Sequence, residues 1–267
     1  MSRLAETFAN LRRDNRTGLI AYVTMGFPDV PATHAIVTAL VEGGADVIEL
    51  GVPFSDPLAD GATIQRSTYH ALQQGVTLAT CLQVTAGLRR AGVVAPIVFM
   101  GYYNPLLAYG LGAFFPDAAA AGVDGLIVVD SPIDEADGLR EEASKAGIDL
   151  IQMIAPTTSE DRIAALLSNA SGFVYCVSIA GTTGARGALP ETLPDFIARV
   201  RRHTKLPIAV GFGVSRFEHV ASIGRLCEAA AIGSAIVDVI ERAQPGEYAA
   251  KVREYVEEVT GRRRAHD

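Results

Sequence analysis

Two carboxylates stand close together in the chain and have the residue types that general acid–base catalysis needs. Glu49 interrupts the apolar run Val47–Leu50, and Asp60 follows in a loop that the chain enters through Gly51 and Pro53. A carboxylate buried in a strand costs free energy unless it is paired or has a chemical task. We therefore expect Glu49 and Asp60 to work as a pair of proton-transferring groups.

Each of these residues also has a structural interpretation. Glu49 could be a satisfied structural charge, and Asp60 could cap a helix that begins at Ala62. Tyr175, near the end of an apolar run, is a core residue unless a ligand faces it. The sequence alone leaves these alternatives open.

Other catalytic groups are badly placed. None of the three lysines (Lys145, Lys205 and Lys251) falls where a predicted strand ends, so a Schiff-base mechanism has no candidate. The five histidines lie on predicted helices or in the C-terminal tail: His34, His70, His203, His219 and His266. We therefore expect no metal site.

Two glycine-containing loops indicate a phosphate site. One strand ends in the segment 211–215, which contains Gly213, and the last strand ends in Ile232-Gly-Ser-Ala235. Backbone N–H groups and a helix N-terminus can bind phosphate at such places, and glycine allows close approach. We expect Ser234 to be both the N-cap and a ligand. The alternative is an ordinary Gly-Ser helix start.

A third loop follows the apolar run that contains Tyr175. Residues 178–188 include three glycines and two threonines. This composition is typical of a lid that closes over a ligand and excludes water, although a simple long loop is the alternative.

The elements that must position these residues alternate regularly along the chain. An amphipathic helix with Leu4, Phe8 and Leu11 comes first, and eight short apolar runs then alternate with helical patterns. The predicted strands are Leu19–Thr24, Asp46–Leu50, Pro96–Met100, Gly125–Val129, Asp149–Ile154, Phe173–Val177, Pro207–Gly211 and Ala229–Gly233. Strands so uniformly apolar are buried on both faces.

This pattern predicts an α/β fold, a (β/α)8 TIM barrel with an additional N-terminal helix, formed by residues 1–267 as a single domain. A doubly wound sheet is the alternative, but no glycine fingerprint follows the first strand. Active sites of such barrels lie at the carboxyl ends of the strands. Glu49 ends the second strand there, and its parity with Val47 predicts that it points into the barrel.

The composition excludes several classes of protein. The chain has 267 residues, 49% of them hydrophobic, and a net charge of −7 without a basic cluster that would suit nucleic acid. The three cysteines, Cys81, Cys176 and Cys227, are far apart and are expected to be buried, reduced thiols. We expect a cytoplasmic protein without a signal peptide or a membrane span.

With these residues assembled, the chain resembles the tryptophan synthase alpha subunit family. The segment Glu49-Leu-Gly-Val-Pro-Phe-Ser-Asp-Pro-Leu-Ala-Asp-Gly61 has the form of the family signature. Further motifs follow the family in order: Thr24–Asp29, Tyr102–Pro105, Gly181–Gly184, Gly211–Gly213 and Gly233–Val237. The resemblance covers essentially the whole chain.

The resemblance implies retro-aldol cleavage of indole-3-glycerol phosphate to indole and glyceraldehyde 3-phosphate. It gives Glu49 the proton transfers at indole C3 and at the glycerol hydroxyl, gives Asp60 the indole N–H, and places Tyr175 at the site. The residues that would enclose the indole are Tyr22, Ile64, Met100 and Ile127. The phosphate cradle would contain Gly184, Phe212, Gly213, Gly233 and Ser234, and Thr183 would be the lid residue that meets Asp60.

The family also implies a partner. A beta subunit that uses pyridoxal phosphate would receive the indole in an alpha2beta2 complex, and the alpha chain itself would carry no cofactor. Asp56, Pro57, Asn104 and Pro105, the last two in a loop over 102–105, match surfaces that face this partner.

The sequence departs from the family pattern at Ile179, Ala180 and Thr182 in the lid, at Ser131, and at Tyr22 where phenylalanine is commoner. Three rivals remain: the same lyase acting alone and releasing free indole, a phosphosugar isomerase, and a catalytically silent regulatory subunit.

Overall fold

The computed structural model describes residues 1–131, 136–177, 189–211 and 213–262, with only the backbone at 136 and 137. The predicted lid over 178–188 lies outside the described residues, as do Thr183, Gly184 and Phe212.

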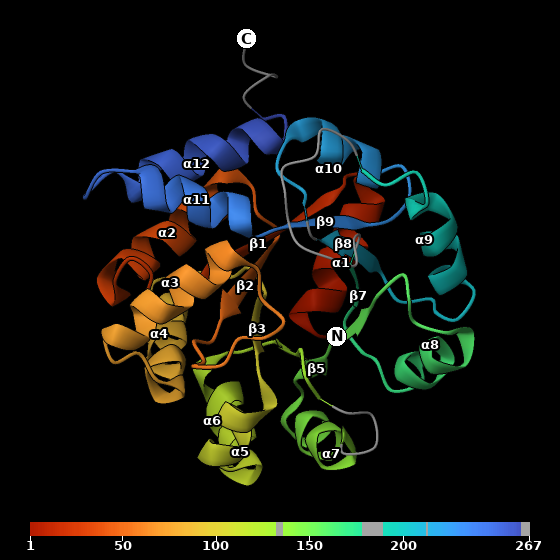
Figure 1. Ribbon diagram of the computed structural model, residues 1–267, viewed down its shortest axis with the longest axis horizontal. Coiled ribbons are helices and arrows are strands. Elements are labelled where there is room, and N and C mark those ends of the chain that lie inside the picture. The colour runs from red at the N-terminus through yellow and green to blue at the C-terminus, as the bar shows by residue number, and fades with distance from the viewer. Residues whose placement is uncertain (132–135, 178–188, 212, 263–267) are drawn as a thin grey trace.

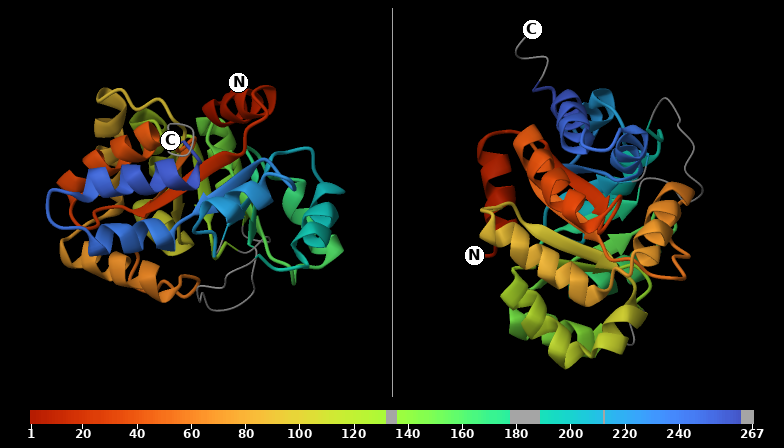
Figure 2. Two further views of the ribbon diagram at one scale, coloured as in Figure 1. Left: turned by 90° about the horizontal axis from the view of Figure 1, so that it is seen from above. Right: turned by 90° about the vertical axis from the view of Figure 1, so that its left-hand side faces the viewer.

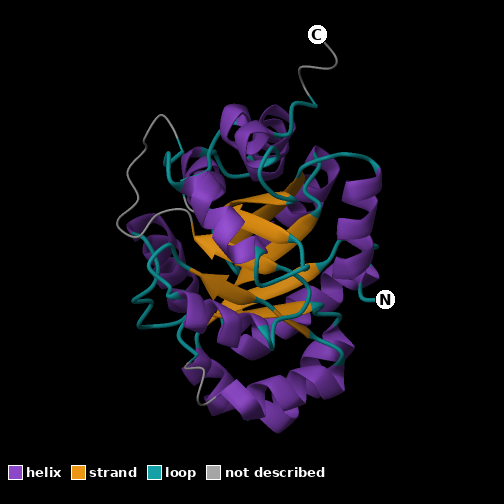
Figure 3. Ribbon diagram, turned by 90° about the vertical axis from the view of Figure 1, so that its right-hand side faces the viewer, coloured by secondary structure: helices purple, strands orange, loops and turns teal. Residues whose placement is uncertain are grey.

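A ring of parallel strands forms the centre of the molecule, and helices surround it (Figure 3). The strands in chain order are β1 Gly18–Thr24, β2 Val47–Gly51, β3 Ile97–Gly101, β4 Gly125–Val128, β5 Asp149–Leu150, β6 Gln152–Ile154, β7 Val174–Val177, β8 Ile208–Gly211 and β9 Ala229–Ile232. Their order in space is β5-β4-β3-β2-β1-β9-β8-β7-β6. The predicted barrel is confirmed, and a doubly wound sheet is excluded because β1 lies directly between β2 and β9.

The fifth predicted strand consists of two pieces. β5 pairs with β4, and β6 pairs with β7, with Ile151 between them. Ile151 still donates its N–H to Leu126 on β4, at 3.0 Å. One short segment thus connects the two ends of the sheet, so nine strand pieces make up eight positions of the barrel.

The helices form the outer layer (Figure 1). Their bounds are α1 Arg3–Arg13, α2 Val30–Gly43, α3 Ala62–Gln73, α4 Leu78–Arg90, α5 Tyr103–Tyr109, α6 Leu111–Ala121, α7 Ala136–Ala146, α8 Glu160–Leu167, α9 Leu193–Arg201, α10 Phe217–Ile223, α11 Ser234–Arg242 and α12 Tyr248–Val259. The predicted loop over 102–105 is wrong, because Tyr103–Pro105 form the first turn of α5. Proline is tolerated there, since the first N–H groups of a helix have no intrahelical partner.

The alternation of side chains along the strands separates two apolar cores. Inward residues such as Val47 on β2 belong to a small core inside the barrel, whereas Ile48 and Leu50 belong to the larger core beneath the helices. Leu4, Phe8 and Leu11 of α1 pack against the inner core. Figure 2 shows α1 lying across one end of the barrel. The predicted N-terminal helix therefore closes the end opposite the carboxyl ends of the strands.

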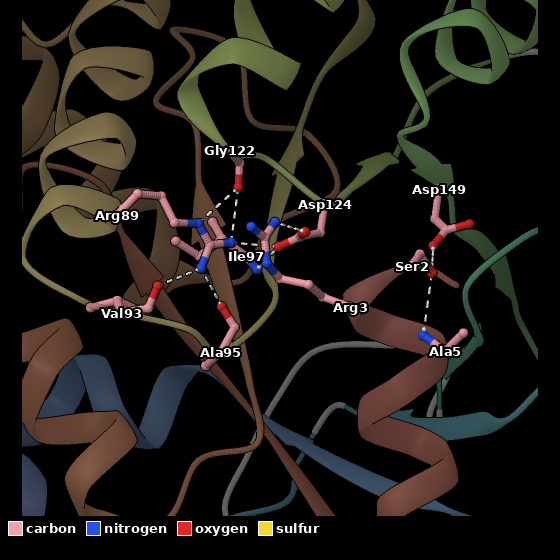
Figure 4. Close-up of polar contacts among 10 residues, drawn as sticks. All are labelled: Ser2, Arg3, Ala5, Arg89, Val93, Ala95, Ile97, Gly122, Asp124 and Asp149. Atoms are coloured by element: carbon pink, nitrogen blue, oxygen red, sulfur yellow. Dashed lines mark hydrogen bonds and ion pairs between the residues drawn. The ribbon is translucent and has the colours of Figure 1, made fainter.

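A buried ion cluster stabilises this closed end (Figure 4). Asp124 is 7% exposed, and its carboxylate accepts hydrogen bonds from Arg3, Arg89 and the Ile97 N–H. Arg89 also donates to the carbonyl oxygens of Val93, Ala95 and Gly122. Both oxygen atoms of the Asp124 carboxylate and all three nitrogen atoms of the Arg89 guanidinium thus have hydrogen-bond partners, as charged groups in a buried cluster require.

We expect Arg3→Ala to lower the free energy of unfolding by about 1 kcal/mol, because Arg3 is half exposed and Asp124 keeps Arg89. Urea unfolding measures this change. Arg13→Ala on the same helix is the control, since Arg13 pairs with exposed Asp14. Equal effects of the two substitutions would contradict the assignment.

The buried positions of Cys81, Cys176 and Cys227 confirm that part of the prediction, and all three are free thiols. Within the part of the chain that the structure describes, no helix is long and apolar enough to cross a membrane.

Candidate active site

A pocket of about 210 Å³ opens at the carboxyl ends of the barrel strands. Strands β1, β2, β3, β7 and β9 and the starts of α3 and α11 contribute to its wall. Predicted site residues that line it are Tyr22, Glu49, Asp60, Ile64, Met100, Tyr175, Gly213, Gly233 and Ser234. The other lining residues are Gly61, Thr63, Val214, Ser215, Ala231, Ala235 and Asp238.

Glu49 lies inside the barrel and is 1% exposed. Among the described residues, its Oε2 atom has no hydrogen-bond partner. Burial, and secondarily the nearby charge of Asp60, raise the pKa of Glu49 to about 8. A satisfied structural charge would have a partner at each oxygen, so the structure does not support that alternative.

Asp60 does not cap α3. The N-cap of that helix is Gly61, without a side-chain hydrogen bond, so the capping interpretation is wrong. The Asp60 carboxylate instead accepts a hydrogen bond from the Tyr102 hydroxyl, at 3.1 Å between Oη and Oδ2. Burial raises the pKa of Asp60 to about 6, and the Tyr102 hydrogen bond partly opposes this rise.

The two carboxyl groups therefore differ in protonation near neutral pH. With a pKa of about 8, Glu49 is mostly protonated at pH 7, whereas Asp60, with a pKa of about 6, is mostly ionised. Groups whose pKa values are pushed apart in one site are typical of a general acid and a neighbouring anionic group. The pocket thus holds a proton donor and a carboxylate together.

Tyr102 is a site residue that the sequence did not single out for this role. Its hydroxyl accepts the Ala59 N–H at 3.0 Å and donates to Asp60. Tyr102 lies 42 positions after Asp60 in the chain. The signals available in the sequence were its place directly after the third strand and its membership of the family motif Tyr102–Pro105, and neither pointed to Asp60. The hydroxyl fixes both the loop and the orientation of the carboxylate.

We expect Tyr102→Phe to raise the pKa of Asp60 by about one unit, because a hydrogen bond to the ionised carboxylate is lost. If Asp60 acts as a carboxylate, the acid limb of the kcat/KM profile moves to higher pH by the same amount. Tyr103→Phe is the control, since Tyr103 contacts Asp130 through its main-chain N–H. An acid limb unmoved in Tyr102→Phe would contradict the assignment.

A chain of hydroxyl groups fixes Tyr22. The Ser67 hydroxyl donates to the carbonyl oxygen of Ile64 at 2.9 Å, so it must accept from Thr24, at 2.6 Å. Thr24 in turn must accept from the Tyr22 hydroxyl, at 3.2 Å. Each hydroxyl has one proton, so the chain runs in one direction. The hydroxyl of Tyr22, a departure from the family pattern, thus connects β1 to α3.

Two tyrosines lie over glycines of neighbouring strands. A Cβ atom on Gly51 would lie 2.1 Å from the Tyr22 hydroxyl, and one on Gly211 would lie 2.1 Å from the Tyr175 hydroxyl. Glycine at these positions makes room for both rings. Tyr175 is buried and lines the pocket, and burial is the main cause that raises its pKa well above the usual value. It remains a protonated hydroxyl near Glu49.

A second part of the pocket wall is the N-terminus of α11, whose first main-chain N–H groups have no intrahelical partner. Gly233 is the N-cap of α11 and Ser234 is its first residue, so the prediction that Ser234 is the N-cap is wrong. The first carbonyl, of Gly233, is already bonded by the N–H groups of Ile236 and Val237. The N–H groups of Ser234 and Ala235 precede these at the positive end of the helix dipole, where an anion is stabilised.

Other predicted residues are placed differently. Ile127 is fully buried in the inner core and does not line the pocket, whereas Met100, which pairs with it on the neighbouring strand, does.

Asp238 lines the pocket but was not predicted from the sequence. It faces the pocket from α11, and its carboxylate accepts a hydrogen bond from Thr63 at 3.3 Å, with Arg66 at 3.9 Å.

The residues predicted to face a partner lie on one rim. Asp56 and Asn104 are exposed, whereas Pro57 and Pro105 are partly buried. Two exposed leucines lie beside them in the sequence: Leu58, which is 92% exposed, and Leu107 on α5. Tyr102 bonds to Ala59 and Asp60 and so connects the β3–α5 segment to the β2–α3 loop.

The described residues contain no group of three His, Cys, Asp or Glu side chains that could hold a metal ion.

Comparison with known proteins agrees with the geometry. The family model described as tryptophan synthase alpha chain matches residues 8–264. The tryptophan synthase alpha chain of Roseiflexus castenholzii is 52% identical over 261 residues, which cover 98% of this chain and 100% of that protein. That of Chloroflexus aggregans is 49% identical over 267 residues, all of both chains.

Solved structures show the same similarity. A chain of tryptophan synthase from Mycobacterium tuberculosis superposes with a TM-score of 0.90 at 38% identity, covering 97% of each chain. Tryptophan synthase subunit alpha from Legionella pneumophila gives a TM-score of 0.90 at 32% identity, covering 98% of each chain. A match of this extent, in sequence and in fold, means that the chain belongs to the tryptophan synthase alpha chain family.

Proposed function

We propose that this chain performs the reaction of its family, the cleavage of indole-3-glycerol phosphate to indole and glyceraldehyde 3-phosphate, with Glu49 and Asp60 as the reacting carboxyl groups. The observation that carries the proposal is the geometry of one pocket that both carboxyl groups line: Glu49 is 1% exposed with its Oε2 atom unpaired among the described residues, and Asp60 accepts the Tyr102 hydroxyl. Burial raises the pKa of Glu49 to about 8 and that of Asp60 to about 6, which agrees with this geometry.

The first step uses the proton of Glu49. Glu49 transfers this proton to C3 of the indole, which leaves the ring with a positive charge that extends to the ring nitrogen. Ionised Asp60 accepts the hydrogen bond of the indole N–H and stabilises this charge. The low polarity that raises the pKa of Glu49 also strengthens the interaction between Asp60 and the ring.

The second step returns the proton. The Glu49 carboxylate removes the proton of the hydroxyl on the carbon attached to C3. The bond between that carbon and C3 breaks, its electron pair neutralises the ring, and the carbon becomes the aldehyde of glyceraldehyde 3-phosphate. Glu49 ends the cycle protonated, so no external acid or base is consumed.

The N–H end of the pocket suits the phosphate. Ser234 and Ala235 begin α11, and Gly213 and Val214 line the pocket from the loop after β8. Gly213 has a φ of +80°, a conformation that favours glycine. Helix dipole and N–H groups attract a dianion without a lysine or arginine. Apolar Ile64 and Met100 line the same pocket, and we assign them to the indole.

We assign the exposed rim to a beta subunit that carries pyridoxal phosphate. The similar Mycobacterium tuberculosis structures are of tryptophan synthase, and this supports a tryptophan synthase beta subunit as the partner. The rim combines exposed Leu58 and Leu107 with exposed Asp56 and Asn104. Apolar groups surrounded by polar ones are typical of a protein interface. Indole is apolar and diffusible, so direct transfer to the partner would prevent its loss.

Steady-state assays of the purified chain test the proposal. Indole and glyceraldehyde 3-phosphate are measured with indole-3-glycerol phosphate as substrate, with and without a tryptophan synthase beta subunit. We expect cleavage that the beta subunit increases. Full activity without the partner favours a lyase that acts alone, and absence of cleavage in both arms favours a silent regulatory subunit; either result overturns its part of the proposal.

A further inference from the structure

We propose that Tyr255 and His219 are positioning residues that hold the Ser215 peptide groups of the β8–α10 loop and so set the geometry of the phosphate end of the pocket. The inference rests on the proposed function for the identity of the bound anion. Neither residue lines the pocket.

Ser215 is held from two sides. Its carbonyl oxygen accepts the hydroxyl of Tyr255 at 2.9 Å, and its N–H donates to Nδ1 of His219 at 3.3 Å. An imidazole nitrogen that accepts an N–H carries no proton, so the acceptor form of His219 is the neutral ring with its proton on Nε2. Both polar main-chain groups of Ser215 are therefore used within the protein.

These two contacts constrain the residues that precede Ser215. The peptide between Val214 and Ser215 is planar, so the bond from the Ser215 N–H fixes the orientation of the whole peptide group. The Tyr255 contact fixes the next peptide group in the same way. Gly213 and Val214 line the pocket and directly precede this fixed peptide group, whereas the N–H group of Ser215 itself is bonded to His219.

Tyr255 extends from a firmly packed helix. Val252 and Val256 of α12 are fully buried, and a Cβ atom on Gly43 of α2 would lie only 3.0 Å from that of Val256. Figure 1 shows α12 beside α11 in the outer layer of helices, and α12 also contacts α2 and α10. Burial, with the charges of Glu258 and Asp238, raises the pKa of Tyr255, so the hydroxyl stays protonated and can donate its hydrogen bond to Ser215.

His219 extends from α10 and is 4% exposed. It belongs to the helix that follows the loop, so a short local contact sets the N–H side of Ser215. Tyr255 lies forty residues away along the chain and sets the carbonyl side. The loop is thus held between α12 and α10. We expect a less firmly held loop to weaken phosphate binding more than it slows the chemical step at Glu49.

Tyr255→Phe tests the carbonyl side, because it removes one hydroxyl and keeps the ring. We expect a rise of about 3- to 10-fold in the KM of indole-3-glycerol phosphate and in the inhibition constant of inorganic phosphate, as for one lost hydrogen bond. We expect kcat to stay within about twofold, because the interaction is equal in ground and transition states. Tyr109→Phe is the matched control, since its hydroxyl donates to exposed Asp117 at 2.7 Å, away from the pocket.

Two substitutions of His219 test the N–H side. His219→Leu removes the acceptor of the Ser215 N–H, and we expect the same rise in KM as for Tyr255→Phe. His219→Asn places a carbonyl oxygen near the position of Nδ1, and we expect it to restore at least half of that rise. Circular dichroism and thermal unfolding of all variants show whether the fold persists at the assay temperature.

Binding of inorganic phosphate, followed by phosphorus NMR, separates this inference from the proposed function. If the parent chain does not cleave indole-3-glycerol phosphate but Tyr255→Phe and His219→Leu still weaken phosphate binding, the proposed function fails and the inference stands. Unchanged phosphate affinity and KM in folded Tyr255→Phe overturn the inference. A loss confined to kcat overturns it as well.

Discussion

Replacement of Glu49 by glutamine is expected to lower the kcat of indole-3-glycerol phosphate cleavage by about 10³-fold, within the range known for loss of a general acid–base group. Glutamine keeps the shape of the side chain but has no proton to transfer to C3. The carboxyl group reacts only during the two proton transfers, so KM should change by less than about threefold. The experiment compares steady-state kinetics of the parent and the variant.

Glu42→Gln is the matched control for this substitution, because Glu42 is an exposed carboxylate on α2 that pairs with Arg253. It should leave kcat within about twofold, as expected for a surface pair. Undiminished turnover in Glu49→Gln, with the fold intact, would exclude Glu49 as the proton donor.

The same substitution should change how stability depends on pH. The pKa of Glu49 rises from 4.5 to about 8 on folding. The folded protein therefore keeps a proton that the unfolded chain loses above pH about 4.5, and parent stability falls as pH rises from about 5 to about 8. Glu49→Gln lacks this loss, which is at most about 5 kcal/mol. Urea unfolding at pH 5, 7 and 9 measures it; parallel curves for parent and variant would contradict the raised pKa.

Replacement of Asp60 by asparagine is expected to lower kcat/KM by about 10²-fold, because a neutral amide stabilises the positively charged indole less well than a carboxylate does. The parent should also lose activity below pH about 6, where Asp60 becomes protonated. Asp60→Asn should lack that acid limb. Rates measured from pH 5 to 9 test both expectations.

Asp117→Asn is the control for the Asp60 substitution, since Asp117 is exposed on α6 and bonds only to Tyr109 in the described contacts. Its pH profile should match that of the parent. An acid limb retained in Asp60→Asn would assign that limb to another group.

The sequence predicted the elements well where a local pattern determined them. Seven of the eight apolar runs became single strands whose bounds differ from the prediction by one residue at most, and the fifth became the two pieces β5 and β6. The parity of Val47 and Glu49 correctly placed the carboxylate inside the barrel. Burial of Glu49 agrees with this parity, because an inward side chain in the middle of β2 is surrounded by the other strands of the barrel and reaches only the bottom of the pocket.

The features that the sequence did not predict depend on contacts between distant segments. The sequence left open whether Asp60 is a helix cap or a reactive carboxylate. The hydrogen bond from Tyr102, which belongs to another βα unit, distinguishes the two. Asp238 and Tyr255 follow the amphipathic pattern of their helices and gave no signal of their contacts with Thr63 and Ser215. The position of the α11 N-cap was missed because Gly233 and Ser234 are both acceptable caps.

Helix α1, which closes one end of the barrel, affects where small molecules enter and leave the pocket. Leu4, Phe8 and Leu11 are buried against the inner core at the end that α1 covers, and the pocket opens at the other end of the barrel. We therefore expect the substrate to enter, and both products to leave, past the rim where Asp60 and the α11 N-terminus lie. Whatever protein covers that rim would control the order in which the two products leave.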